Sequence, residues 1–224
     1  MADRLKADPL TLLQEGAAAL GLDLAPSVLE QFRLYLEEVW RWNARINLTG
    51  AKSLEELVLK HFLDSLAVLP WLPPGPSLAD LGAGAGFPGL VLKLARPEME
   101  LTLVESRGKK AVFLGYLASL LKLEGVAVAE EHLTPALART WEHRFHLVIS
   151  RATFSLPRFL EVAAPLLLPG GMLLALKGPG LKSGEIKEAE TRLAPLGLGP
   201  LTLKEYRLPL TGQGRLLVMA GRQG

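Results

Sequence analysis

The chain contains no cysteine among its 224 residues. Without a thiol it cannot form a disulfide framework, a thiolate zinc site or an iron–sulfur cluster, and it cannot use a cysteine nucleophile. The four histidines stand at positions 61, 132, 143 and 146, and the last two have no third ligand within sequence reach. We therefore expect no metal site.

Long apolar runs are absent as well. No run approaches the roughly 20 residues of a membrane span, because proline, glycine or a charge interrupts each one. The first ten residues lack the apolar segment of a signal peptide. Hydrophobic residues make up 49% and charged residues 21% of the chain, which is typical of a globular protein. We expect a cytoplasmic protein that does not contact a membrane.

Helical patterns dominate residues 1–72, which we assign to an N-terminal helical extension. Apolar residues recur at helical spacing in 9–21 and 26–48, and each of these segments begins with a proline. The sequence Ser-Leu-Glu-Glu at 53–56 is a capping box, which predicts a third helix that ends before Pro70. The prolines and glycine of 70–76 then predict a linker.

Residues 73–224 alternate short apolar runs with amphipathic segments, and we assign them to a second domain. This alternation predicts a Rossmann-like, parallel α/β sheet with helices on both faces. Strands are expected at 77–81, 101–104, 126–129, 146–150 and 172–176, and helices at 86–95, 109–121, 134–139, 156–168 and 184–193. Two more strands, 201–208 and 215–220, have no helix between them and predict a terminal antiparallel hairpin. The domain has 18 Lys/Arg against 13 Asp/Glu, an excess of +5 that permits nucleic-acid binding.

A glycine-rich loop follows the first expected strand. Gly82 and Gly84 allow tight turns and close approach to a ligand, and ligands of open α/β sheets bind beyond the carboxyl ends of the strands. Residues 84–89 match the dinucleotide pattern G-x-G-x-x-G, which alone is a weak signal. Asp80 would repel a pyrophosphate but suits a cationic amino acid group, so it favours S-adenosylmethionine over NAD. A helix N-cap is the alternative role for Asp80.

Glu105 ends the second expected strand, 23 residues after Gly82. A carboxylate there can accept hydrogen bonds from both ribose hydroxyls of either cofactor, so it does not discriminate between them. A solvated strand end is the alternative. The expected terminal hairpin does discriminate, because it looks like the antiparallel last strand of class I methyltransferases.

Six segments resemble the RsmG (GidB) family in their order and spacing, over about residues 26–220. They are WNARINLT (42–49), KHFLDS (60–65), DLGAGAGFPG (80–89), SRGKKAVFL (106–114), ISRA (149–152) and ALKG (175–178). The glycine loop alone is generic. The asparagine and His-Asp-Ser segments ahead of it make the resemblance specific.

The resemblance implies a class I S-adenosylmethionine-dependent methyltransferase fold with an N-terminal helical extension. It further implies S-adenosylmethionine as the methyl donor and N7 of one guanosine in 16S rRNA of the small ribosomal subunit as the acceptor. The cofactor contacts that it implies, joined by Asp80 and Gly84 from the loop argument, are Gly82, Phe87, Glu105, Ser106, Arg107, Leu133, Thr134 and Arg151. The family usually has Arg-Ala-Glu where this chain has residues 132–134, so the adenine contact lacks a carboxylate and rests on the Leu133 backbone and the Thr134 hydroxyl.

Methylation at N7 needs no general base, because N7 attacks with a lone pair and has no proton to lose. We expect catalysis to come from alignment of the reacting atoms and from dipoles around the developing positive charge. Arg151, after the fourth expected strand, is suited to hold guanine O6 or a phosphate through its planar donor fork. An ion pair with Asp80 or Glu105 is the structural alternative.

Asn43 and Asn47 are the only asparagines of the chain and lie four residues apart on an expected helix. We predict that they join Arg151 in the catalytic site, where they brace the extension against the target pocket. A helix cap and a core hydrogen bond are the alternative roles.

Lys60, His61 and Lys177 are the residues predicted to contact the substrate. A solvated charge is the alternative for Lys60. His61 shares a helical face with Asp64 and Ser65, but neighbours on one helical turn cannot provide the geometry of a serine-hydrolase triad. We expect this face to be structural and close to the substrate.

Three other functions stay open at the level of the sequence. An NAD-dependent oxidoreductase is disfavoured by Asp80 and by the lack of an evident catalytic Tyr/Lys or His pair. A non-catalytic RNA- or nucleotide-binding protein is disfavoured by the intact glycine loop. A methyltransferase with another substrate is the third. The chain shows no coiled-coil pattern, and we expect a monomer.

Overall fold

A computed structural model describes residues 8–74, 77–141 and 143–223. The first seven residues and the last two residues of the expected linker, 75 and 76, lie outside the described part. No helix among the described residues is long and apolar enough to cross a membrane. These residues also contain no cluster of three or more acidic or histidine side chains that would hold a metal ion.

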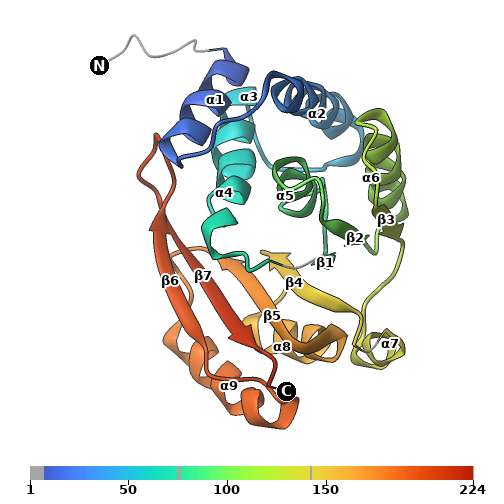
Figure 1. The fold of residues 1–224 in the computed structure, drawn as a ribbon, viewed down its shortest axis with the longest axis vertical. Coiled ribbons are helices and arrows are strands. Elements are labelled where there is room, and N and C mark those ends of the chain that lie inside the picture. The colour runs from blue at the N-terminus through green and yellow to red at the C-terminus, as the bar shows by residue number, and fades with distance from the viewer. Residues whose placement is uncertain (1–7, 75–76, 142, 224) are drawn as a thin grey trace.

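A seven-stranded sheet in the order β3-β2-β1-β4-β5-β7-β6 forms the centre of the molecule (Figure 1). Its strands are β1 (Ser77–Leu81), β2 (Glu100–Val104), β3 (Val126–Ala129), β4 (Phe145–Arg151), β5 (Leu167–Lys177), β6 (Thr202–Arg207) and β7 (Gly214–Gly221). Neighbours among β1 to β5 run parallel, whereas β7 is antiparallel to both β5 and β6. The predicted sheet and terminal hairpin are therefore confirmed. The strand order reverses between β1 and β4, which is where open α/β sheets bind their ligands.

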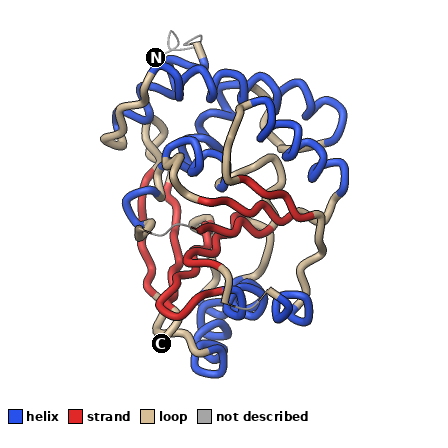
Figure 2. Tube along the Cα trace, turned by 45° about the vertical axis from the view of Figure 1, so that its right-hand side comes forward, coloured by secondary structure: helices blue, strands red, loops and turns tan. Residues whose placement is uncertain are grey.

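Helices cover both faces of this sheet (Figure 2). One face carries α1 (Pro9–Ala19), α2 (Pro26–Ile46), α3 (Leu54–Leu57), α4 (Leu63–Leu66), α5 (Gly89–Ala95) and α6 (Gly108–Leu120). The other carries α7 (Pro135–Thr140), α8 (Leu156–Ala163) and α9 (Ser183–Leu193). The N-terminal helices share one hydrophobic core with α5, α6 and the sheet. The extension predicted for residues 1–72 therefore contributes to the core beneath the site.

Local chemistry sets the ends of the N-terminal helices. Asp8 caps α1, because its carboxylate accepts a hydrogen bond from the amide of Thr11 at 3.1 Å. Ser53 does the same for α3, accepting from the amide of Glu56 at 3.1 Å. The third predicted helix is not regular, however. A π-helical turn, η1 (Val58–Phe62), separates α3 from α4, and a 3₁₀ turn (Leu69–Trp71) follows.

Three predicted boundaries after residue 77 are wrong for identifiable reasons. The helix expected at 156–168 ends at Ala163, because Pro165 cannot continue it and residues from Leu167 onward pair with β4. Strand β5 is correspondingly longer than the predicted 172–176 and runs through Gly170 and Gly171. The helix after the glycine loop begins at Gly89 instead of residue 86, which leaves the intervening residues free to line a pocket.

Candidate active site

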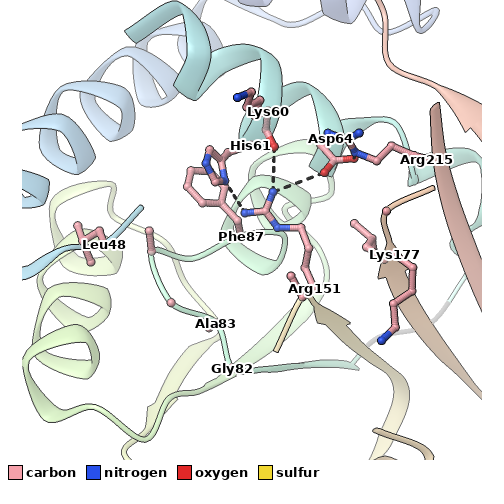
Figure 3. A pocket seen from close by; sticks show the side chains of 15 residues that line it. Leu48, Lys60, His61, Asp64, Gly82, Ala83, Phe87, Arg151, Lys177 and Arg215 are labelled. Carbon is pink, nitrogen blue, oxygen red and sulfur yellow. Dashed lines mark hydrogen bonds and ion pairs between the residues drawn. The ribbon is translucent and has the colours of Figure 1, made fainter. Parts of the chain in front are cut away.

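A pocket of about 480 Å³ opens at the carboxyl ends of β1 and β4, beneath the η1–α4 segment (Figure 3). Its lining comes from six segments of the chain: Leu48, Lys60, His61, Asp64, Gly82, Ala83, Gly84, Ala85, Phe87, Arg151, Ala152, Leu176, Lys177, Gly178 and Arg215. Two sets of side chains meet there. The glycine loop forms one wall, and a cluster around the Arg151 guanidinium forms the other.

Backbone conformation explains the glycines of the first wall. Gly82, Gly84 and Gly86 have φ values of +76°, +59° and +95°, which residues with a side chain rarely adopt. The loop is also fastened from the N-terminal extension, because the buried Tyr35 hydroxyl of α2 donates a hydrogen bond to the carbonyl of Ala85 at 2.8 Å. A glycine loop that approaches a ligand is thus held from behind by α2.

Asp80 lies beneath this loop and is fully buried. One carboxylate oxygen accepts a hydrogen bond from the amide of Gly89 at 2.8 Å, at the start of α5. The other oxygen, Oδ1, has no hydrogen-bond partner among the described residues. Burial raises the pKa of Asp80 to about 7, against the opposing effects of the Gly89 amide and Arg151. The helix cap considered from the sequence is present, and one carboxylate oxygen is left for a ligand.

Glu105 ends β2 and supports the loop from the side. Its carboxylate accepts hydrogen bonds from the amides of Gly84 and Arg107, both at 2.9 Å. Ser106 and Arg107 are exposed just beyond it, and Leu133 is buried after β3. These residues lie along neighbouring strand ends beside the pocket and do not line it.

Arg151 dominates the second wall, at the end of β4. Its guanidinium donates to the carbonyl of Lys60 at 3.0 Å and to Nδ1 of His61 at 2.5 Å, and it lies 3.5 Å from a carboxylate oxygen of Asp64 (Figure 3). It also sits over the ring of Phe87, 5.4 Å from the centroid. The ion-pair partner is Asp64, so the pairing with Asp80 or Glu105 considered from the sequence does not form.

The protonation state of His61 follows from these contacts. Arg151 can only donate, so Nδ1 of His61 must accept. Nε2 then carries the proton of the neutral ring and donates to the hydroxyl of Thr49 at 2.7 Å. Burial, followed by the charge of Arg151, lowers the pKa of His61 to about 3. His61 is thus neutral near pH 7, with both nitrogens engaged.

Asp64 connects the cluster to the terminal hairpin. This buried carboxylate also pairs with Nε of Arg215 at 3.3 Å and accepts a hydrogen bond from the Tyr206 hydroxyl at 3.0 Å. Ser65 donates to the carbonyl of His61, so the predicted structural role of this helical face is seen. Arg215 and Tyr206 were not predicted as site residues, because nothing in a strand sequence shows which distant helix faces it.

The predicted site residues fall into two groups. Those that line the pocket are Gly82, Gly84, Phe87, Arg151, Lys60, His61 and Lys177. Those that do not are Asp80, Glu105, Ser106, Arg107, Leu133, Thr134, Asn43 and Asn47.

Asn43 and Asn47 occupy structural positions. The side-chain oxygen of Asn43 accepts from the amide of Thr49 at 2.7 Å, and Asn47 ends α2 with a left-handed φ of 50°. Neither asparagine lines the pocket, and their predicted role in bracing the extension within the catalytic site stays a prediction. The helix cap and internal hydrogen bond that were the alternative are what the structure contains.

The two predicted substrate lysines are engaged with acids. Lys60 pairs with Glu56 on the same helical segment, and its side chain is half exposed. Lys177 donates to the carbonyl of Phe154 at 2.7 Å and to Glu185 at 3.1 Å, and its ammonium points away from Arg151 in Figure 3. Neither ammonium is directed at the Arg151 cluster.

The first wall fits S-adenosylmethionine. The unpartnered Oδ1 of Asp80 is a buried acceptor suited to an ammonium group, and the carboxylate of Glu105 retains lone pairs for ribose hydroxyls. The open space at Gly84, where an added Cβ would have only one neighbour, at 3.9 Å, allows close approach. These are the donor and acceptor types that the cofactor needs.

Solved structures with this fold define the class of protein. An O-methyltransferase from Bacillus cereus in complex with SAH aligns over 84% of this chain and 91% of its own, with a TM-score of 0.60 and 15% identity. A predicted O-methyltransferase from Agrobacterium tumefaciens aligns over 73% and 80%, with a TM-score of 0.54 and 26% identity. The fold and the site are those of a class I S-adenosylmethionine-dependent methyltransferase.

Relatives in sequence narrow this class. The family model GidB, described as rRNA small subunit methyltransferase G, matches residues 28–211. "Ribosomal RNA small subunit methyltransferase G" of Geobacter sulfurreducens is 39% identical over 94% of this chain and 96% of its own. The protein of the same name from Deinococcus deserti is 41% identical over 93% and 86%. The chain belongs to the GidB family, which confirms the resemblance seen in the sequence.

Proposed function

We propose that this methyltransferase transfers the methyl group of S-adenosylmethionine to N7 of a guanosine in the 16S rRNA of the small ribosomal subunit. The observation that carries the proposal is the Arg151 guanidinium, which is fixed on three sides at the pocket opposite the glycine loop. The names of the relatives, small-subunit rRNA methyltransferases, support this class of substrate.

The reaction balances without a base. The N7 lone pair forms the new bond to the methyl carbon while the carbon–sulfur bond breaks, and the positive charge passes from sulfonium to guanine. No proton moves. The site agrees, because the imidazole of His61 is neutral but both its nitrogens are engaged by Arg151 and Thr49.

Each wall has its own task in this proposal. Asp80 and Glu105 hold the ammonium and ribose groups of the cofactor, whose sulfonium supplies the methyl group. Arg151 holds guanine O6 or the adjacent phosphate, so that N7 meets the methyl carbon in line at about 3 Å. Its Nε has no hydrogen-bond partner among the described residues and supplies a donor for that contact.

Partner and compartment follow from the substrate. A small-subunit rRNA substrate is met in the cytoplasm, and one chain contains both walls of the site, so we propose a monomer. Light scattering of the purified protein tests the monomer. A dimer in which each active site contains residues of both chains would contradict it.

Methyl transfer from labelled S-adenosylmethionine tests the function. Naked small-subunit rRNA and intact subunits are each incubated with the protein, and the modified base is mapped. We expect label on a single guanosine N7. Label on a different atom or RNA would retain the enzyme class but overturn the acceptor. A protein that binds the cofactor and labels neither substrate would overturn the proposed substrate.

A further inference from the structure

The turn after α2 is built to present one hydroxyl. Asn43 accepts from the amide of Thr49 at 2.7 Å, and Asn47 reverses the chain through its left-handed conformation. The hydroxyl of Thr49 also accepts from the amide of Ala51 at 3.2 Å. Asn43, Asn47 and Ala51, which lie outside the glycine loop, therefore fix the position of the Thr49 side chain.

This hydroxyl meets the ring of His61 across the pocket rim. The 2.7 Å contact to Nε2 fixes the ring orientation, and the ring also lies 5.0 Å from the ring of Phe87. A carbonyl of the π-helical turn, that of Lys60, accepts from the same guanidinium that His61 contacts. π-helical turns are frequent at functional sites, and this one supplies two acceptors to Arg151.

The direction of every hydrogen bond in the chain of contacts is determined. Arg151 only donates, so Nδ1 of His61 accepts and its Nε2 donates to Thr49. A histidine with the proton on Nδ1, or a doubly protonated one, would face the guanidinium with a hydrogen and lose the 2.5 Å contact. The tautomer of His61 and the orientation of the Arg151 guanidinium are therefore coupled, and the hydrogen bond to Thr49 selects both.

We propose that Thr49 and His61 are positioning residues, through which the N-terminal helical extension fixes the Arg151 guanidinium for the acceptor base. The inference rests on the proposed function for its catalytic consequence. It gives the Asn43–Thr49 turn a role in turnover although none of its polar side chains touches the substrate. The extension is then part of the active site, in addition to being part of the core.

A pair of variants at Thr49 isolates the hydroxyl. Thr49→Val keeps the shape and removes the acceptor for His61, whereas Thr49→Ser keeps the hydroxyl. We expect kcat to fall by about tenfold in Thr49→Val and by less than about threefold in Thr49→Ser, with the Kd of S-adenosylmethionine unchanged in both. Thr191→Val, an exposed site on α9, is the matched control and should leave kcat unchanged.

A double-mutant cycle separates positioning from a general loss of packing. In an Arg151→Ala background, Thr49→Val should lower kcat by less than about twofold, because the group it positions is gone. Full additivity would overturn the proposal, as would wild-type kcat in Thr49→Val. His61→Phe, which keeps an aromatic ring beside Phe87, should behave as Thr49→Val does.

The histidine tautomer gives a readout that needs no RNA. Nitrogen NMR of the full chain should show His61 as the neutral Nε2–H form from pH 5 to pH 8, and Thr49→Val should disturb that signal. An Nδ1–H or charged form would overturn the proposed positioning of Arg151 by Thr49 and His61, even if the enzyme methylates rRNA. If the wild-type protein labels no rRNA while this signal is present, the proposed function fails and the arrangement of Thr49, His61 and Arg151 does not.

Discussion

The two walls of the pocket are built in contrasting ways. The cofactor wall is mainly one stretch, residues 80–89, and Glu105 at the end of the neighbouring strand completes it; carboxylates that accept from backbone amides hold it in place. The acceptor wall joins segments far apart in sequence, since His61 and Arg151 are 90 residues apart and Asp64 and Tyr206 are 142 apart. The first depends on local conformation that any class I methyltransferase needs. The second exists only when the extension, β4 and the terminal hairpin have come together, so it is where a family can specialise.

Removal of Arg151 should break the acceptor wall alone. We expect Arg151→Ala to lower kcat by about 100-fold or more, because misplacement of reacting groups by an ångström has effects of this size. The hydrogen bonds and ion pair of the guanidinium go to η1 and α4, and it meets the glycine loop through the ring of Phe87, so the Kd of S-adenosylmethionine should change by less than about threefold. Steady-state kinetics and calorimetry measure the two quantities.

Arg151→Lys is the control for charge in this experiment. It keeps the positive charge but loses the planar donor fork, and it should recover little of the activity. A kcat within about threefold of wild type in the alanine variant would contradict the assignment. Loss of cofactor binding would instead assign Arg151 to the cofactor site, a role that the family resemblance also implies.

The opposite experiment adds one methyl group to the cofactor wall. Gly84→Ala places a Cβ where the nearest atom is 3.9 Å away, so the fold loses only about 1 kcal/mol for the left-handed conformation. We propose that the cofactor approaches through that space, so its Kd should rise by about tenfold. Gly82→Ala is the contrasting variant, because its Cβ would lie 2.4 Å from a methyl group of Thr153 and should destabilise the fold more. Unchanged affinity in Gly84→Ala would show that the ligand binds elsewhere.

The contrast between the walls also explains what the sequence could predict. The glycine loop, Asp80 and Glu105 lie at fixed places relative to predicted strands, so spacing alone located that wall. Arg151 was identified through the family resemblance, which implies an arginine after the fourth strand. Its partners were not, because the pairing of Asp64 with Arg215 depends on the terminal hairpin packing against α4, and no local pattern encodes that contact.

The predicted role of the two asparagines stays a prediction. Asn43 and Asn47 are the only asparagines of the chain, and we predicted that they brace the extension against the target pocket. In the structure they shape a turn, and the side chain that reaches the pocket cluster from that turn is Thr49. The π-helical turn at 58–62 was not predicted, because five residues are too few for their apolar spacing to be distinguished from that of the flanking α-helical turns.

The protonation of Asp80 tests the cofactor wall by pH. Burial raises the pKa of Asp80 to about 7 in the fold from an ordinary value of 3.8, so the folded state holds a proton that the unfolded state has lost between those values. This contribution to stability is present below pH 3.8 and is lost as the pH rises through 7. The free energy of unfolding of Asp80→Asn, relative to that of wild type, should therefore rise by about 1 kcal/mol between pH 5 and pH 6. Above pH 8 this difference should not rise further.

Comparison of the two proteins at each pH cancels the effect of His61. The lowered pKa of His61 has the opposite sign, because the unfolded histidine takes up a proton below pH 6.5 and the folded one does not. Chemical denaturation across pH 5 to 9 measures the difference. A stability difference independent of pH would mean that Asp80 is ionised in the fold even without the cofactor.

The smallest change in the free energy of unfolding is expected from a substitution at the contact between α2 and the glycine loop. Tyr35→Phe removes the 2.8 Å hydrogen bond to the carbonyl of Ala85 and leaves that carbonyl without its donor, at a cost of about 1 kcal/mol. The ring keeps its stacking on Phe87, at 5.3 Å between centroids, so the pocket retains its shape. Tyr116→Phe removes a hydroxyl that accepts a hydrogen bond from the exposed Arg41, so it is the matched control and should cost less than about 0.5 kcal/mol. If Tyr35→Phe weakens cofactor binding as well as stability, the extension supports both walls; if only stability falls, its catalytic contribution is confined to the Arg151 wall.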